Sequence, residues 1–224
     1  MVKTRCASVS SQPPMTSDGP TRRGFIAALV SSGLVAVLHS RSSAQSRSTT
    51  VVPSAVTRSI QLRDLDDRPV DPLLDAAGGP VVVIFTSVEC PISNRYAPEL
   101  RRLHEAFSTR GVRFHLVYPN PADAPPAIRT HHREFAYPMS ALRDPRGELV
   151  ALTGATVTPE AAVFHKRTLV YRGRIDDRFV AFGVERPAAT ERDLENALNA
   201  ILAGRPVVRA TTPAIGCFLS DFLR

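Results

Sequence analysis

The feature that most constrains the fold is the uninterrupted apolar run Val81–Phe85, which follows the turn residues Gly78-Gly79-Pro80. The run consists of β-branched and aromatic residues, and a run of this kind is typical of a strand buried on both faces. Strands buried in this way occur mainly in largely parallel sheets that helices cover on both sides. The run therefore predicts the central strand of an α/β domain.

The pattern after this strand predicts a helix and then a second strand. Apolar residues at 96, 100, 103 and 107 share one helical face, and Gly111 ends that helix. Alternating polar and apolar residues over 112–116 predict the second strand. The other expected elements are a short helix at 127–135, an extended segment at 138–142, an antiparallel hairpin of 161–164 with 168–171, and a helix from a capping box at 190–193 to residue 202. This order places parallel strands beside an antiparallel pair in one α/β layer.

The length and the charge limit the class of protein. The chain has 224 residues, enough for one globular domain with additional terminal sequence. Its formal net charge is +7, but residues 1–44 carry five Lys or Arg against one Asp and so account for +4 of it. The remainder shows no basic run and no basic stripe with interleaved aromatic residues. We therefore expect no nucleic-acid partner.

The first 44 residues have the order of an export signal. The paired arginines Arg22 and Arg23 precede an apolar run from Phe25 to Leu38, and small and polar residues then lead to Ala44. The paired arginines followed by Phe25 resemble the twin-arginine signal. Because the apolar run is shorter than the roughly 18–20 residues that span a bilayer, we expect cleavage after Ala44 and an exported, periplasmic chain. The alternatives are a disordered basic leader and an uncleaved leader that tethers the chain to the membrane outside the cytoplasm.

Two cysteines, Cys90 and Cys217, remain once the leader with Cys6 is removed. In an oxidising compartment such thiols either pair or react. Cys90 follows the buried strand and precedes Pro91, a residue favoured at the first helical position. Its thiol is therefore expected at a helix N-terminus, where the thiolate, which is the reactive nucleophile, is stabilised.

The neighbours of Cys90 bear on its ionisation. Ser87 and Ser93 can each donate a hydrogen bond to the sulfur and so stabilise the thiolate, whereas the charge of Glu89 opposes ionisation. The competing interpretation of Cys90 is a small buried apolar side chain.

The residues around Cys90 resemble a known family. The stretch 82–93 (VVIFTSVECPIS) is similar to the thioredoxin-like redoxins, which include the thiol-specific antioxidant and alkyl hydroperoxide reductase group. Pro98 resembles the proline that kinks the first active-site helix of that family, and Thr158-Pro159 resembles its cis-proline turn beside the reactive cysteine. The resemblance implies a thioredoxin-like α/β fold, with a central mixed sheet flanked by helices. It also implies a substrate groove shaped by Pro91, Thr158 and Pro159.

The sequence departs from the reaction motifs of the family. Ser93 stands where the usual dithiol has its second cysteine, which excludes simple Cys-x-x-Cys exchange. Val83 stands where peroxiredoxins have a proline, although Ser87 fits their hydroxyl position. Copper-delivering relatives use Cys-x-x-x-Cys, and because Asn94 replaces the second thiolate we expect no metal and no cofactor. Cys217 is then the candidate for resolving a mixed disulfide, the alternatives being a packing thiol or a thiol that pairs with another chain.

Two pairs of adjacent polar residues stand apart from these motifs. His131-His132 lies in a polar segment, and neighbouring helical side chains point about 100° apart, so the pair needs further ligands to hold a metal. Asp176-Asp177 has no accompanying nucleophile, and we interpret it as a solvated loop or an Arg–Asp surface network.

The sequence thus predicts four segments: a twin-arginine export signal at 1–44, a flexible lead-in at 45–55, a thioredoxin-like redoxin domain at 56–205, and a C-terminal tail at 206–224 that carries Cys217. We expect a thiol–disulfide oxidoreductase in which Cys90 is the nucleophile and Cys217 resolves the intermediate. Its expected partner is a protein or a small molecule with a thiol or disulfide. The alternatives are peroxide reduction and a non-catalytic binding module that uses the same groove.

Overall fold

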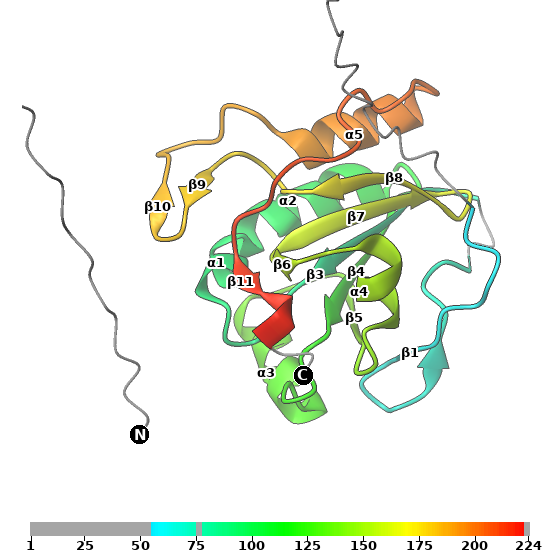
Figure 1. The fold of residues 1–224 in the computed structure, drawn as a ribbon, viewed down its shortest axis with the longest axis vertical. Helices are drawn as coiled ribbons and strands as arrows, with labels where there is room; N and C mark the ends of the chain where they lie inside the picture. The colour runs from blue at the N-terminus through cyan, green and yellow to red at the C-terminus, as the bar shows by residue number, and fades with distance from the viewer. Residues whose placement is uncertain (1–54, 75–77, 222–224) are drawn as a thin grey trace, which may run out of the picture. The chain divides into compact units, whose positions relative to one another are not determined.

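The computed structural model describes residues 55–74 and 78–221, and the predicted export signal and nearly all of the predicted lead-in lie outside these ranges. In the described residues, seven strands form one mixed sheet in the order β2-β1-β5-β4-β3-β7-β8 (Figure 1). The elements are β1 (Leu62–Arg63), β2 (Pro69–Val70), β3 (Val81–Phe85), α1 (Pro91–Arg95), α2 (Ala97–Ser108), β4 (Arg113–Tyr118), α3 (Pro125–Glu134), β5 (Ser140–Arg143), α4 (Glu148–Thr153), β6 (Val157–Thr158), β7 (Glu160–His165), β8 (Thr168–Gly173), β9 (Phe179–Ala181), β10 (Val184–Glu185), α5 (Asp193–Leu202), β11 (Cys217–Phe218) and the 3-10 turn η1 (Leu219–Asp221).

Strand β3 lies at the centre of the sheet, as its apolar run predicts. It pairs in parallel with β4 and antiparallel with β7, and all of its side chains are buried. Because successive side chains of a strand point to opposite faces, Val82 and Ile84 enter one core cluster while Val81, Val83 and Phe85 enter the other. Parallel pairing of β4 with β5 and antiparallel pairing of β7 with β8 complete the predicted mixed layer.

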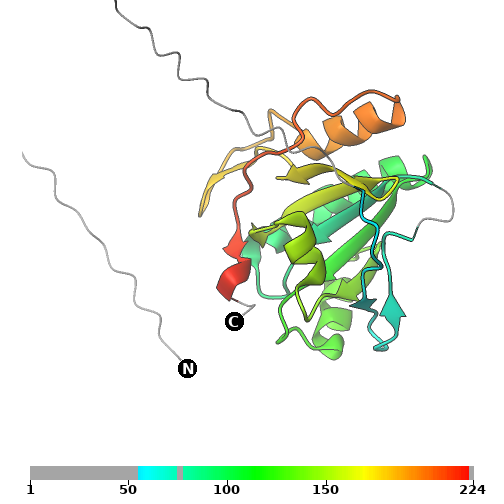
Figure 2. The ribbon, with the colours of Figure 1, turned by 45° about the vertical axis from the view of Figure 1, so that its right-hand side comes forward.

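Helices cover both faces of this sheet. Apolar side chains of α1, α2 and α5 pack in the cluster that contains Val82 and Ile84. On the opposite face, α4 packs with β3, β5 and β7, together with residues of β1. The ribbon shows α4 in front of the sheet and α2 behind it, and the turned view keeps this arrangement (Figures 1 and 2). The loop that joins β3 to α1 and leads to Cys90 therefore emerges from a fully buried strand.

The helix expected after Cys90 is divided in two. α1 ends at Arg95, Tyr96 lies between, and α2 starts at Ala97 with Pro98 in its first turn. Proline lacks the amide hydrogen that would continue the helical ladder, so a break at this point follows from its position. The short helix at 127–135, the extended segment at 138–142 and the hairpin of β7 with β8 are confirmed, with ends shifted by a few residues.

Two local details differ from the sequence predictions. The capping box at 190–193 is wrong, because Thr190 donates its amide and hydroxyl hydrogens to Asp177 and α5 begins after Arg192. Helix α4 was not predicted at all. Its first amides are satisfied by the buried Asp144, which accepts hydrogen bonds from residues 148, 149 and 150 at 2.8–3.1 Å.

Among the described residues, no helix combines the length and the apolar character that a membrane span requires.

Candidate active site around Cys90 and Cys217

Cys90 sits at the turn between β3 and α1, as its sequence context predicts. Its backbone is extended and forms the N-cap of α1, with Pro91 following at the first helical position. The Cys90 amide donates to the Ser87 carbonyl at 3.2 Å, and the Asn94 amide donates to the Cys90 carbonyl at 3.1 Å. The side chain is only 2% exposed. A helix of five residues, such as α1, has only a small dipole with which to stabilise a thiolate. Contacts from other elements therefore contribute to the environment of this thiol.

Thr158, the residue before Pro159, lies directly against Cys90. The Cys90 thiol donates to the Thr158 carbonyl with a separation of 3.1 Å. The peptide bond between Thr158 and Pro159 is cis, as the family resemblance implies. The buried Glu160 holds the segment before this turn, because its carboxylate accepts the amide hydrogens of Thr156 at 2.7 Å and of Val157 at 3.3 Å. The segment before the turn is thus held by the first side chain of β7, the strand that follows the turn.

Cys217 reaches Cys90 from the far end of the chain. Strand β11 pairs antiparallel with β6 so that Cys217 stands opposite Thr158. The two sulfur atoms are 2.9 Å apart, longer than the roughly 2.0 Å of a disulfide bond. Both side chains are thiols in this structure, and they are separated by 127 residues in the sequence. Little movement separates this arrangement from a disulfide.

The surroundings of Cys90 favour its thiolate. Burial is the largest single influence and opposes ionisation. The nearby side chains of Cys217, Ser93 and Thr158 and the backbone of Ser93 outweigh it, so that the pKa of Cys90 lies below its ordinary value. Ser93 is buried beside Cys90 in the first turn of α1. Ser87 lies beside the carboxylate of Asp123, where burial raises the pKa of that carboxyl and the Val88 amide and Ser87 offset only part of the rise.

The loop between β3 and α1 is supported by contacts that the sequence analysis did not predict. The amide of Val88 donates to Asp123 at 3.3 Å, and its carbonyl accepts a hydrogen bond from the Asn94 side chain at 3.1 Å. The Asn94 oxygen in turn is 2.7 Å from Nε2 of His131, whose Nδ1 is 2.9 Å from the Tyr118 hydroxyl. Both backbone polar groups of Val88 are thus held by side chains. The sequence contains no spacing signal for these contacts, which join the loop after β3, the turn at Asp123, α1, α3 and β4.

The two adjacent histidines are part of this packing. Burial lowers the pKa of His131, and burial together with the charge of His131 lowers the pKa of His132 to about 4. Both rings pack against Tyr137. Among the described residues, no three His, Cys, Asp or Glu side chains are grouped so that they could hold a metal ion.

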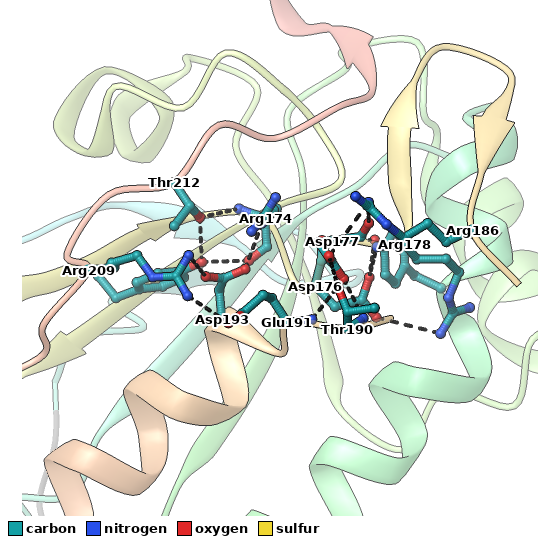
Figure 3. A network of polar contacts seen from close by, with 12 residues as sticks. Arg174, Asp176, Asp177, Arg178, Arg186, Thr190, Glu191, Asp193, Arg209 and Thr212 are labelled. Atoms are coloured by element: carbon teal, nitrogen blue, oxygen red, sulfur yellow. Dashed lines mark hydrogen bonds and ion pairs between the residues drawn. The ribbon is translucent and has the colours of Figure 1, made fainter. Parts of the chain in front are cut away.

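The paired aspartates form an Arg–Asp network, but they are buried rather than solvated (Figure 3). The hydroxyl of Tyr96, between the two active-site helices, donates to Asp176 at 2.6 Å. Asp177 accepts hydrogen bonds from the amides of Glu191 and Thr190, and these hold the pKa of Asp177 well below its usual range. Burial and the neighbouring carboxylate raise the pKa of Tyr96. The pair therefore joins the active-site helices to the loop before α5.

Ser93→Ala is expected to raise the pKa of Cys90, because the substitution removes a hydroxyl that stabilises the thiolate. The pH dependence of Cys90 alkylation by iodoacetamide measures this shift. Between the two midpoints the variant has less thiolate and reacts more slowly. Ser108→Ala, at the far end of α2, is the matched control and should leave the midpoint unchanged. An unchanged midpoint in the Ser93 variant would contradict the assigned role.

Comparisons with known proteins agree with this architecture. A model of the AhpC/TSA family matches residues 55–174. An uncharacterized conserved protein from Geobacillus kaustophilus is similar, with 27% identity and a TM-score of 0.62, over 75% of this chain and 90% of that chain. A hypothetical protein from Sinorhizobium meliloti has 22% identity and a TM-score of 0.64, over 76% and 94% of the two chains. A secreted disulfide oxidoreductase from Mycobacterium tuberculosis, homologous to DsbE of E. coli, has 20% identity and a TM-score of 0.46, over 65% and 96%. A comparison with curated protein sequences finds no match.

Proposed function

The chain belongs to the AhpC/TSA family and has a thioredoxin-like fold, and from this premise we propose that it is a thiol–disulfide oxidoreductase. Cys90 is the nucleophile and Cys217 is the resolving cysteine. The observation that carries the proposal is the separation of 2.9 Å between the two sulfur atoms. A pair of thiols at this distance can be oxidised to a disulfide with little rearrangement of the backbone.

The first step is attack by the Cys90 thiolate on a substrate disulfide. The neighbouring side chains of Cys217, Ser93 and Thr158 stabilise this thiolate before the attack. A bond forms between Cys90 and one substrate sulfur, the substrate S–S bond breaks, and the departing thiolate takes a proton from solvent. The product is a mixed disulfide on Cys90.

The second step releases the substrate. Cys217 loses its proton to solvent, and its thiolate attacks the sulfur of Cys90 in the mixed disulfide. The second substrate thiolate departs and is protonated, so the substrate gains two electrons and the protein retains a disulfide between Cys90 and Cys217. The exchange is reversible, and a dithiol donor returns the protein to its reduced form.

The proposed partner is a protein or small molecule that carries a thiol or a disulfide. The Thr158 carbonyl borders the sulfur of Cys90, Pro159 follows Thr158 through a cis peptide bond, and Pro91 is exposed at the start of α1. We assign the substrate groove to these three residues, because any group that reacts with Cys90 must pass beside them.

We also propose that the protein works outside the cytoplasm. The support is the leader sequence, in which Arg22 and Arg23 precede the apolar run from Phe25 to Leu38. An oxidising compartment suits a pair of thiols that cycles through a disulfide.

The proposal is tested by treating the purified, reduced chain with one equivalent either of an oxidised dithiol, which carries a disulfide, or of peroxide. Intact mass with and without alkylation should show the loss of two hydrogens, and peptide mapping should place the new bond between Cys90 and Cys217. Cys6→Ser serves as the control, because the reaction should not depend on the leader cysteine.

Each result of this oxidation has one meaning. Faster reaction with the disulfide supports disulfide exchange. A sulfenic acid on Cys90 that forms faster with peroxide would replace the proposal with peroxide reduction, the alternative raised by the sequence. Two thiols that stay fully alkylatable with both oxidants would favour the non-catalytic binding module.

A further inference from the structure

We propose that the C-terminal strap, defined as residues 213–221, occupies the substrate position in the resting protein and must leave before a polypeptide disulfide can reach Cys90. This inference rests on the proposed function, because it concerns access of substrate to the same cysteine. The ribbon shows β11 beside β6 and α1 (Figures 1 and 2). The chain therefore runs from the end of α5 across the domain to reach Cys90.

The strap and a substrate strand compete for the same edge. Strand β11 pairs with β6 in a register that places Cys217 opposite Thr158 and Phe218 opposite Val157. The Leu219 amide continues this pairing by donating to the Thr156 carbonyl at 2.9 Å. A substrate cysteine that approaches along this edge must bring its sulfur within bonding distance of Cys90. The Cys217 sulfur already occupies that point.

The nucleophile is also enclosed while the strap is in place. Cys90 is 2% exposed, and its sulfur is in contact with the sulfur of Cys217 and the Thr158 carbonyl. A reacting sulfur needs an approach of about 3–3.5 Å in the correct orientation. An extended polypeptide therefore reaches Cys90 only when the strap has moved aside.

Gly216 allows the backbone of the strap to approach the backbone of Thr158 closely. An added Cβ at this position would lie 2.0 Å from the Thr158 oxygen and 2.5 Å from its carbon. Both are backbone atoms of the turn against which Cys90 packs, so neither can yield as a flexible side chain could. Glycine is the residue that permits such an approach of two backbones. Any side chain at residue 216 should hold β11 away from β6.

The segment immediately before the strap is firmly anchored to the domain. Thr212 donates its amide hydrogen to the Arg172 carbonyl at 3.1 Å, and Arg209 forms ion pairs with Glu191 at 2.6 Å and with Asp193 at 3.4 Å (Figure 3). Beyond this anchored point, β11 has only two residues, of which Phe218 is 62% exposed. Leu219, 2% exposed, anchors the far side. This distribution allows β11 to leave while Thr212 stays in place.

The strap identifies the class of partner that can displace it. The occupant is an extended chain segment that pairs with β6 and presents a cysteine opposite Thr158. A competitor that uses the same contacts is another extended polypeptide segment with a cysteine. We therefore infer that the substrate is a protein or peptide disulfide, for which the strap is a built-in competitor.

The experiment measures access to Cys90 in chains that all carry Cys217→Ser, so that no resolving reaction takes place. Gly216→Val and Leu219→Ala should each raise the rate of Cys90 labelling by a bulky polymer-linked maleimide roughly tenfold, because both weaken the closed state. Phe218→Ala is the matched control, since its exposed side chain does not hold the strap. Circular dichroism establishes that each variant is folded. Equal labelling rates in all four folded proteins would overturn the proposal.

A second measurement needs no further variant. Hydrogen exchange in the reduced wild-type chain should show the Leu219 amide exchanging well before the amides that join β3 and β7, because the strap opens locally. Protection of Leu219 equal to that of the β3–β7 amides would mean that the strap opens only on global unfolding, which would overturn the proposal. Neither measurement depends on a disulfide between Cys90 and Cys217. A failure of the proposed function is therefore distinguishable from a failure of the strap.

Discussion

Cys90→Ser is expected to abolish disulfide exchange and peroxide reduction alike, leaving only the uncatalysed rate. The reason is that both reactions begin with a thiolate at this position, and serine supplies none. The activity of the purified variant toward a peptide disulfide, followed by release of the peptide thiol, measures the effect. Ser93 and Thr158 remain in place in the variant, so the substitution removes the nucleophile while leaving its neighbours unchanged.

Cys217→Ser completes this prediction by separating the two steps. The variant retains the nucleophile, so the first mixed disulfide on Cys90 should form, and it should persist because no second thiolate is present to resolve it. Mass spectrometry should detect the trapped adduct, and multiple turnover should be lost. Cys6→Ser should behave as the wild type. Turnover that continues at the wild-type rate in the Cys217 variant would exclude Cys217 as the resolving cysteine.

Phe85→Ala is expected to lower the free energy of unfolding by about 3–5 kcal/mol. The Phe85 side chain is fully buried at the end of β3, in the cluster that contains Leu142 and Leu149. Its removal forfeits apolar burial and leaves a cavity that a rigid sheet cannot fill by collapse. Chemical denaturation of the reduced wild type and variant measures the difference.

A matched phenylalanine provides the control for this measurement. Phe182 lies in the connection between β9 and β10 and is 70% exposed. Phe182→Ala should therefore change the free energy of unfolding by no more than about 0.5 kcal/mol. Similar losses at Phe85 and Phe182 would contradict the assignment of β3 as the buried centre of the sheet.

The elements with a strong local pattern were predictable from the sequence. The apolar run of β3 and the hairpin of β7 with β8 follow from residue type and alternation along the chain. The break between α1 and α2 follows from Pro98. The cis bond before Pro159 was implied by the resemblance to a family.

Other features depend on contacts between segments that are distant in sequence. Helix α4 has only six residues, and its buried Leu149 and Val150 pack in a cluster with β3 and β7, which are distant in sequence from one another. The predicted capping box does not form, because the amide and the hydroxyl of Thr190 donate to the carboxylate of Asp177 instead of capping α5. Asp123 accepts a hydrogen bond from the amide of Val88, in the loop between β3 and α1, although the two residues are 35 positions apart. Local propensity contains no information about such partners, since they meet only when the sheet has formed.

The sequence by itself determined the α/β class, the central strand β3 and the position of Cys90 at the turn that follows it, because these depend on neighbours in the chain. It also named Cys217 as a candidate partner without showing where that residue lies. Only the tertiary structure decided that β11 pairs with β6 and brings the two sulfur atoms to 2.9 Å. The physical reason is that the unpaired backbone groups of a strand such as β6 can bond to any segment whose backbone comes close enough, so the strand's own sequence does not identify its partner. That approach depends here on Gly216 fitting against Thr158, a contact between residues far apart in the chain.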